Sequence, residues 1–198
     1  MKIAIAALAA VSLALAGLPS AWAAEDVPVV TDQPAAAPGR AGQLDQLFAK
    51  LKAAGGDAAA GQAEDQIVAL WLQSGSDTVD LLMSWSAEAI ANKDYARALD
   101  ILDRVVTLKP DYAEGWNKRA TVYFLTDDYS QSLSDIEHVL VLEPRHFGAL
   151  TGLGAIFREL GDDKRAIDAY KQALALDPHL DDAQKALDEL QKDTGKDI

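Results

Sequence analysis

The chain has 198 residues, a formal net charge of −13 at pH 7 and no cysteine. A chain this acidic is a poor candidate for binding nucleic acid, which attracts clustered Lys and Arg, and anionic membrane surfaces repel it. Without cysteine it has no disulfide, no lipidated cysteine and no thiolate ligand for a metal. The acids are spread along the chain, so they would attract basic partners or simply keep the protein in solution.

The N-terminus has the three parts of a secretory signal peptide. Lys2 supplies a positive charge, residues 3–18 form an uncharged apolar run, and Ala21-Trp22-Ala23 is a small-x-small cleavage site. An uncleaved membrane anchor is the alternative, but the apolar run is short for the roughly 20 residues that span a bilayer. We expect cleavage after Ala23, a periplasmic or secreted location, and no stable membrane insertion of the remaining chain.

Residues 24–43 are rich in Pro, Ala and Gly and have no helical period, which predicts a flexible leader acting as a spacer or a tether. Two stripes of apolar residues at helical spacing follow in residues 44–78, with a Gly-Gly-Asp break at 55–57. We interpret 44–78 as a degenerate N-terminal helical repeat that caps the units after it.

From residue 79 the chain repeats with a period of 34 residues. Pro110, Pro144 and Pro178 mark this period, and each follows the second of two apolar runs at helical spacing within its unit. Proline disfavours helix in the residue before it, so each proline ends a second helix. A fixed period of this length predicts stacked helix–turn–helix units rather than one globular core.

Small residues stand where the two helices of each unit would touch, which allows the helix axes to approach closely. They are Ser86, Ala120 and Gly154 on the first helices, and Ala98, Ser132 and Ala166 on the second helices.

This pattern resembles the tetratricopeptide repeat (TPR) family. The middle unit carries Trp116, Ala120, Tyr123, Asp128-Tyr129, Ser132, Val139 and Pro144 at the family's spacing. The resemblance gives units 79–112, 113–146 and 147–180, followed by a capping helix at 181–193. It implies an all-α fold, a TPR solenoid of antiparallel helix pairs forming a right-handed superhelix. Arg119 departs from the pattern because the family usually has leucine there, and we expect its stem to pack while its charged head reaches water.

The sequence offers little catalytic chemistry. His138, His146 and His179 lack the i, i+4 spacing of a helical zinc pair, and no cysteine assists them. Gly152-Leu153-Gly154 lies inside a helical repeat, so helix packing explains it better than a dinucleotide-binding loop. We therefore expect no catalytic residue, no metal, no cofactor and no enzymatic activity, while a site assembled across several helices would leave no motif to find.

The resemblance implies that the first helices line a concave wall, which binds an extended peptide or a helix of a partner protein. That wall would consist of Met83, Ala87, Ile90, Asn117, Lys118, Thr121, Phe124, Thr151, Ala155 and Arg158. For the apolar members Met83, Ile90 and Phe124, packing between units is an equal alternative. The wall does not resemble the TPR type that grips the carboxylate tail of cytosolic chaperones, because the first and third units lack the required basic and asparagine residues.

Together these observations predict a non-enzymatic protein-protein interaction adaptor or scaffold of the bacterial cell envelope, with protein partners and without nucleic acid. A periplasmic chaperone or assembly factor that holds a client during secretion or maturation is the first alternative. An enzyme, or the dedicated subunit of an enzyme, is the second.

Overall fold

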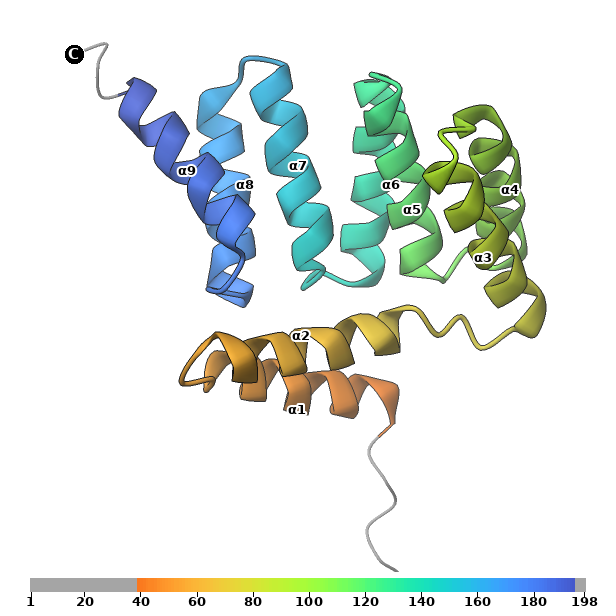
Figure 1. Cartoon of the computed structure of the whole chain (residues 1–198), viewed down its shortest axis with the longest axis horizontal. Helices are drawn as coiled ribbons and strands as arrows, with labels where there is room; N and C mark the ends of the chain where they lie inside the picture. The colour runs from red at the N-terminus through yellow and green to blue at the C-terminus, as the bar shows by residue number, and fades with distance from the viewer. Residues whose placement is uncertain (1–38, 195–198) are drawn as a thin grey trace, which may run out of the picture. The chain divides into compact units, whose positions relative to one another are not determined.

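The computed structural model describes residues 39–194, and over this range the chain forms nine α-helices and no strand (Figure 1). The predicted signal peptide and most of the predicted leader lie outside the described residues. The helices are α1 (Arg40–Lys52), α2 (Asp57–Trp71), α3 (Asp77–Ala91), α4 (Tyr95–Leu108), α5 (Ala113–Leu125), α6 (Tyr129–Leu142), α7 (Phe147–Glu159), α8 (Asp163–Leu176) and α9 (Asp181–Thr194).

The turn inside each repeat unit is built the same way, by the dipeptides Lys93-Asp94, Asp127-Asp128 and Gly161-Asp162. In each dipeptide the second residue caps the following helix, because its carboxylate accepts a backbone N–H three residues later, at 3.3, 3.3 and 3.0 Å. The first residue has a φ of 57°, 59° and 72°, respectively, which is left-handed backbone. Glycine adopts this conformation freely, whereas a side chain there costs roughly 1–2 kcal/mol.

The predicted close contacts between paired helices are confirmed, since all six small residues are buried. In the middle unit, Ser132 Oγ donates a hydrogen bond to the Ala120 carbonyl oxygen at 2.8 Å. In the last unit, a Cβ atom added to Gly154 would lie 2.8 Å from the ring of Tyr170 on α8. Larger side chains at these positions would push the two helices apart.

The helix α9 ends the stack, packing on α8 through one apolar face. Ala183, Leu187 and Leu190 are buried there against Ala166 and Tyr170. The remainder of α9 is acidic and basic, as the terminal helix of a repeat array needs in order to face water. Over residues 39–194, no helix is both long enough and apolar enough to cross a membrane.

The helices α1 and α2 lie side by side across the turns that link the repeat units (Figure 1). Their apolar faces share one core with Phe147 at the start of α7 and with Leu176 and Leu180 beside the α8–α9 turn. Trp71, the last residue of α2, stacks on His146 with ring centroids 4.2 Å apart and planes 9° apart. This pair of helices therefore braces several units at once.

Polar contacts fix the pair on the same turns. Tyr112, before α5, donates its hydroxyl to the Leu72 carbonyl oxygen at 2.9 Å. Arg145, before α7, pairs with Asp45 of α1 at 2.7 Å. These contacts join residues up to 100 positions apart in the sequence.

The sequence predicts that residues 44–78 form a degenerate repeat that caps the units after it; in the structure these residues form a helix pair, which lies across the turns that link the units (Figure 1). These residues lack the proline of the other units and the aspartate that caps their second helices, so these two signals of the repeat geometry are missing. Their largest apolar residue, Trp71, instead packs in one core with Phe147 at the start of α7. The first helix also begins at Arg40, inside the range 24–43 predicted as the leader.

Candidate functional site

A hollow of about 130 Å³ opens between α5 and α7, with α6 contributing to its floor. It is lined by Asn117, Ala120, Thr121, Phe124, Ser132, Ile136, Gly148, Ala149, Gly152, Ala155 and Ile156. We call this hollow the α5–α7 groove. Its lining carries no charged residue, its floor is apolar, and its walls expose an amide and a hydroxyl that can bond to a peptide backbone.

Four of the predicted wall residues meet in this groove: Asn117, Thr121, Phe124 and Ala155. They come from the second and third units, at the junction where the two first helices face each other. Phe124 also packs against the core that contains Ile136 and is only half-buried. One part of its ring therefore contacts the core, and another part lines the groove.

Two lining residues that the sequence reasoning missed, Gly148 and Gly152, make the groove accessible from the α7 side. The 34-residue period aligns them with Glu114 and Lys118 of the middle unit, so the third unit has no side chain where the second has two charged ones. A Cβ added to Gly152 would meet only Ile136 Cδ1, at 3.6 Å. The signal in the sequence was glycine at two positions where the preceding unit has charged side chains. Residues that could bind a ligand through a side chain were considered, so these glycines were overlooked.

The other predicted wall residues lie outside the α5–α7 groove. Met83 and Ile90 of α3 pack into cores with buried residues of α4, the other helix of their own unit, and one of these cores also includes Val122 of the next unit. Ala87 is exposed on α3. Thr151 lines a separate hollow between α7 and the start of α9, and its hydroxyl donates to the Phe147 carbonyl oxygen.

The two predicted cationic wall residues are engaged by acids. Lys118 Nζ lies 3.2 Å from Glu114 of the same helix, and Arg158 lies 3.6 Å from Glu189 of α9. Asn117 also donates its amide to Glu114, at 3.0 Å. The positive charges of Lys118 and Arg158 are therefore largely balanced within the protein.

Glu114 is the centre of a buried polar cluster beside the groove. Burial alone would raise the pKa of Glu114, but the hydrogen bond from His146 and the charge of Lys118 hold it below its ordinary value. His146 Nδ1 accepts the Ala149 N–H at 3.1 Å, so its Nε2 carries the proton and donates to Glu114 at 3.1 Å. The cluster ties α5 to the start of α7 and fixes the spacing of the two groove walls.

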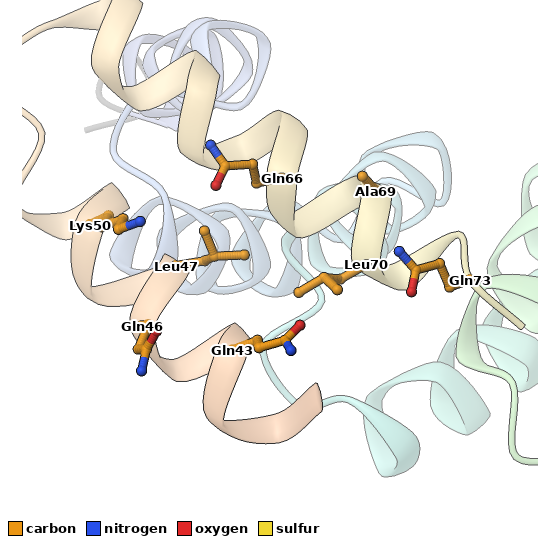
Figure 2. A pocket seen from close by; sticks show the side chains of 8 residues that line it. All are labelled: Gln43, Gln46, Leu47, Lys50, Gln66, Ala69, Leu70 and Gln73. Carbon is orange, nitrogen blue, oxygen red and sulfur yellow. The ribbon is translucent and has the colours of Figure 1, made fainter. Parts of the chain in front are cut away.

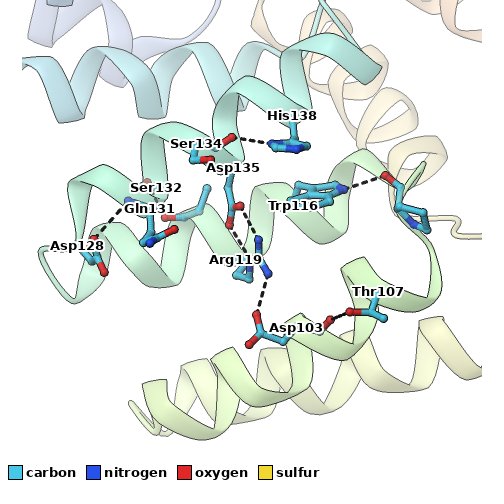
Figure 3. Close-up of polar contacts among 12 residues, drawn as sticks. Asp103, Thr107, Trp116, Arg119, Asp128, Gln131, Ser132, Ser134, Asp135 and His138 are labelled. Carbon is cyan, nitrogen blue, oxygen red and sulfur yellow. Dashed lines mark hydrogen bonds and ion pairs between the residues drawn. The ribbon is translucent and has the colours of Figure 1, made fainter.

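Arg119 corrects the expectation that its charged head reaches water. Its guanidinium donates two hydrogen bonds to Asp135 of α6, at 2.8 and 2.7 Å, and one to Asp103 of α4 at 2.7 Å (Figure 3). Its side chain is 16% exposed, and that of Asp135 is 3% exposed. The bidentate geometry suits arginine, so this residue joins two repeat units where the family usually has an apolar contact.

A second, larger hollow of about 330 Å³ lies along the α1–α2 pair (Figure 2). It is lined by Gln43, Gln46, Leu47, Lys50, Gln66, Ala69, Leu70 and Gln73. Glutamine amides dominate its polar lining, and amides hydrogen-bond but neither activate a nucleophile nor transfer protons at neutral pH. Lys50 is the one ionisable side chain in this lining.

The histidines serve the structure in ways that their spacing did not show. His138 stacks on Trp116 with ring centroids 4.3 Å apart, and His179 pairs with Asp57 of α2 at 3.1 Å. Among the residues that the structure describes, no group of three or more His, Cys, Asp or Glu side chains is arranged to hold a metal ion.

Comparisons with known proteins agree with this architecture. Residues 148–180 match the family model of the tetratricopeptide repeat. A TPR repeat-containing protein of Rhizobium etli is 40% identical over 150 residues, which cover 76% of this chain and 74% of that protein. The chain therefore belongs to the tetratricopeptide repeat proteins, and the predicted all-α TPR solenoid is confirmed.

Solved structures show the same fold at low sequence identity. The Sgt2 TPR domain from Aspergillus fumigatus superposes with a TM-score of 0.58 at 22% identity, covering 61% of this chain and 82% of that one. The first TPR of Spaghetti (RPAP3), bound to the HSP90 peptide SRMEEVD, gives 0.57 at 20% identity, covering 59% and 93%. MamA gives 0.56 at 17% identity, covering 68% and 81%.

Proposed function

We propose that this protein is a non-enzymatic adaptor of the bacterial cell envelope that binds a segment of a partner protein in the α5–α7 groove. The observation that carries the proposal is the groove itself, an uncharged hollow with an apolar floor and glycines on one wall. Its volume of about 130 Å³ suits a small or medium apolar side chain, while Asn117 and Thr121 offer polar groups to the peptide backbone.

The relatives support protein binding as the general role. Two neighbouring structures are TPR domains of RPAP3 in complex with peptides of HSP90 and HSP70. Those peptides, SRMEEVD and SGPTIEEVD, are acidic. The groove of the present chain has no unpaired cation in its lining, and Lys118 and Arg158 beside it already pair with acids. We therefore assign it an uncharged, apolar segment rather than an acidic tail.

The envelope location is proposed on the basis of the N-terminal sequence alone. Lys2, the apolar run 3–18 and the Ala21-Trp22-Ala23 site are the support. Intact mass measurement of the protein purified from its own cells should give a chain that begins at Ala24. A chain that keeps residues 1–23 and sediments with membranes would overturn this part of the proposal.

Site-specific photo-crosslinking tests the groove. A photoreactive residue in place of Thr121 lies in the groove, whereas one in place of Gln131, exposed at the start of α6, lies outside it. We expect Thr121 to capture a discrete partner in living cells and Gln131 not to capture it. Equal capture from both positions would contradict the groove assignment.

A groove-filling variant sharpens the same test. Gly152→Leu places an apolar side chain in the groove, next to Ile136, and should abolish capture from Thr121. Gly61→Leu is the matched control, because a Cβ added to Gly61 of α2 meets nothing within 4 Å and lies away from the groove. Both changes replace glycine in a helix and should leave the circular dichroism spectrum helical.

A further inference from the structure

The third repeat unit contains two glycines that its own packing does not require. The three repeat units hold five glycines, of which three meet a structural demand. An added Cβ would lie 2.7 Å from a side-chain atom at Gly115 and 2.8 Å from one at Gly154, and Gly161 has a φ of 72°. At Gly148 and Gly152 the nearest atom would be 3.4 and 3.6 Å away. Glycine is a weak helix former, so these two positions lower helix stability without permitting a close helix contact.

These two glycines lie between two hollows, one on each side of α7. Both line the α5–α7 groove, and Gly148 also lines a hollow of about 510 Å³ between α7 and the start of α9. We call this space the α7–α9 hollow. Because Gly148 is exposed and has no side chain, a peptide backbone can pass over α7 there, from one space into the other. Its apolar lining includes Phe147, Leu180 and Ala183, and its charged lining includes Asp181, Asp182 and Lys185.

The α7–α9 hollow has one carboxylate more than its cations balance. Lys185 pairs with Asp182 at 3.5 Å, and His179, which also lines the hollow, pairs with Asp57 of α2 at 3.1 Å. Asp181 is exposed, and no cation in the described part of the chain pairs with its carboxylate. Asp181 therefore attracts a positively charged group that enters the hollow, and the apolar lining suits the methylene stem of a lysine or an arginine.

The two spaces therefore select different side chains. The α5–α7 groove has no charged lining and suits an uncharged apolar residue, whereas the α7–α9 hollow suits a cation. They are separated by α7, and a helix with its side chains is roughly 10 Å wide. An extended chain advances about 3.3 Å per residue, so residues about three positions apart reach the two spaces together.

We propose that the bound segment of the partner carries a small or medium apolar residue in the α5–α7 groove and a lysine or arginine three positions away, paired with Asp181. This inference rests on the proposed function, because it extends the segment that occupies the groove. The backbone between the two residues crosses α7 at Gly148. The formal net charge of −13 adds a general attraction for such a basic segment.

Thermal melting tests the role of the glycines. Gly148→Ala and Gly152→Ala should each raise the melting temperature, because alanine is the better helix former and the added Cβ has room. Gly154→Ala is the control and should lower it, since its Cβ would stand 2.8 Å from the ring of Tyr170. If Gly148→Ala and Gly152→Ala lower the melting temperature as well, packing requires these glycines and the passage over α7 is overturned.

Three synthetic peptides test the motif itself. They share the sequence acetyl-Gly-X-Ser-Gly-Val-Gly-Ser-X-Gly-amide, in which X is Lys, Gln or Glu on both sides of Val, so either binding direction is served. NMR titration of the ¹⁵N-labelled whole chain follows the amide signal of Gly152 for the groove and that of Asp181 for the hollow. We expect the Lys peptide to shift both signals and to bind at least tenfold more tightly than the Glu peptide.

Two variants of equal charge identify the acid that pairs with the peptide. Asp181→Asn should weaken binding of the Lys peptide at least threefold and leave the Gln peptide unchanged. Asp168→Asn, an exposed position on α8 outside both hollows, removes the same charge and should leave both peptides unchanged. Equal weakening by the two variants would reveal an effect of net charge and would overturn the pairing with Asp181.

The titrations separate this inference from the proposed function. If no peptide shifts the Gly152 signal, the groove does not bind a segment, and the proposed function and this inference both fall. If all three peptides shift Gly152 with equal affinity, the groove remains a binding site and the basic residue of the motif is overturned.

Discussion

Two carboxyl groups meet where α2 crosses the α8–α9 turn. Asp177 is fully buried; its Oδ1 accepts the His179 N–H at 3.0 Å, and its Oδ2 has no donor unless Glu64 of α2 carries a proton. Burial, and then the charge of Asp177, raise the pKa of Glu64; burial also raises the pKa of Asp177 against the opposing effect of His179. Asp65 adds a smaller repulsion on Glu64.

These shifts set the direction of the pH dependence. A carboxyl whose pKa is higher in the folded state binds more protons when folded, so its stabilising effect is complete below the unfolded pKa of about 4 and is lost as pH rises through the folded pKa. At neutral pH the two carboxyl groups therefore lower the free energy of unfolding. Asp177→Asn supplies an amide that donates to Glu64 and keeps an oxygen for the His179 N–H.

We expect Asp177→Asn to raise the free energy of unfolding at pH 7.5 by about 1 kcal/mol. An unpartnered buried polar atom costs roughly 1–3 kcal/mol, and the lower end applies because water reaches the half-buried Glu64. Urea unfolding at pH 4.5 and pH 7.5 measures the effect, with the gain shrinking at the lower pH. Asp182→Asn, a fully exposed neighbour on α9, is the control. A variant less stable than the parent at pH 7.5 would refute the shared-proton reasoning.

Two further predictions concern the repeat units. Arg119→Leu restores the family's usual residue but leaves Asp135 buried without its partner, so we expect a loss of about 3 kcal/mol in urea unfolding. Removing the exposed ion pair of Arg165 with Asp162 should change the free energy of unfolding little by comparison. An Arg119→Leu variant as stable as the parent would contradict the buried network. Lys93 has a left-handed backbone conformation that glycine adopts without strain, so Lys93→Gly should raise the free energy of unfolding by about 1 kcal/mol. Gly161→Ala, at the corresponding position of the third unit, should lower it. Thermal melting measures both variants, and the reverse order would show that these turns carry no strain.

The repeat architecture was predictable because local chemistry specifies it. Prolines at a fixed period end the second helices, aspartates cap their starts, and small residues such as Ala120 and Gly154 mark the helix contacts. Each of these signals acts within one unit, so a single sequence is enough to read them. The fold class followed from the repetition of the same signals three times.

The position of the α1–α2 pair was not predictable for the opposite reason. It depends on the stacking of Trp71 on His146 and on the ion pair between Asp45 and Arg145. These residues lie far apart in the chain, and the 34-residue repeat does not predict contacts between them. The role of Arg119 was missed similarly, because its two acids lie 16 residues away on either side. Those acids were visible in the sequence, and their equal spacing on adjacent second helices was the available signal.

The candidate site was predictable in part. Family positions led to Asn117, Thr121 and Phe124, which do line the groove, but they also led to Met83, which packs against α4. A position in a repeat pattern predicts which face of the helix a side chain lies on. Whether it lines a hollow depends on its neighbours, and here Gly152 of the next unit makes the hollow.

The affinity of the captured partner for groove variants tests the central claim most directly. Isothermal titration with the parent protein, Gly152→Leu and Gly61→Leu compares a filled groove with a matched change elsewhere. We predict that Gly152→Leu weakens binding at least tenfold, about 1.4 kcal/mol, while Gly61→Leu binds like the parent. Unchanged affinity in Gly152→Leu, with the fold intact by circular dichroism, would contradict the assignment of the α5–α7 groove as the binding site.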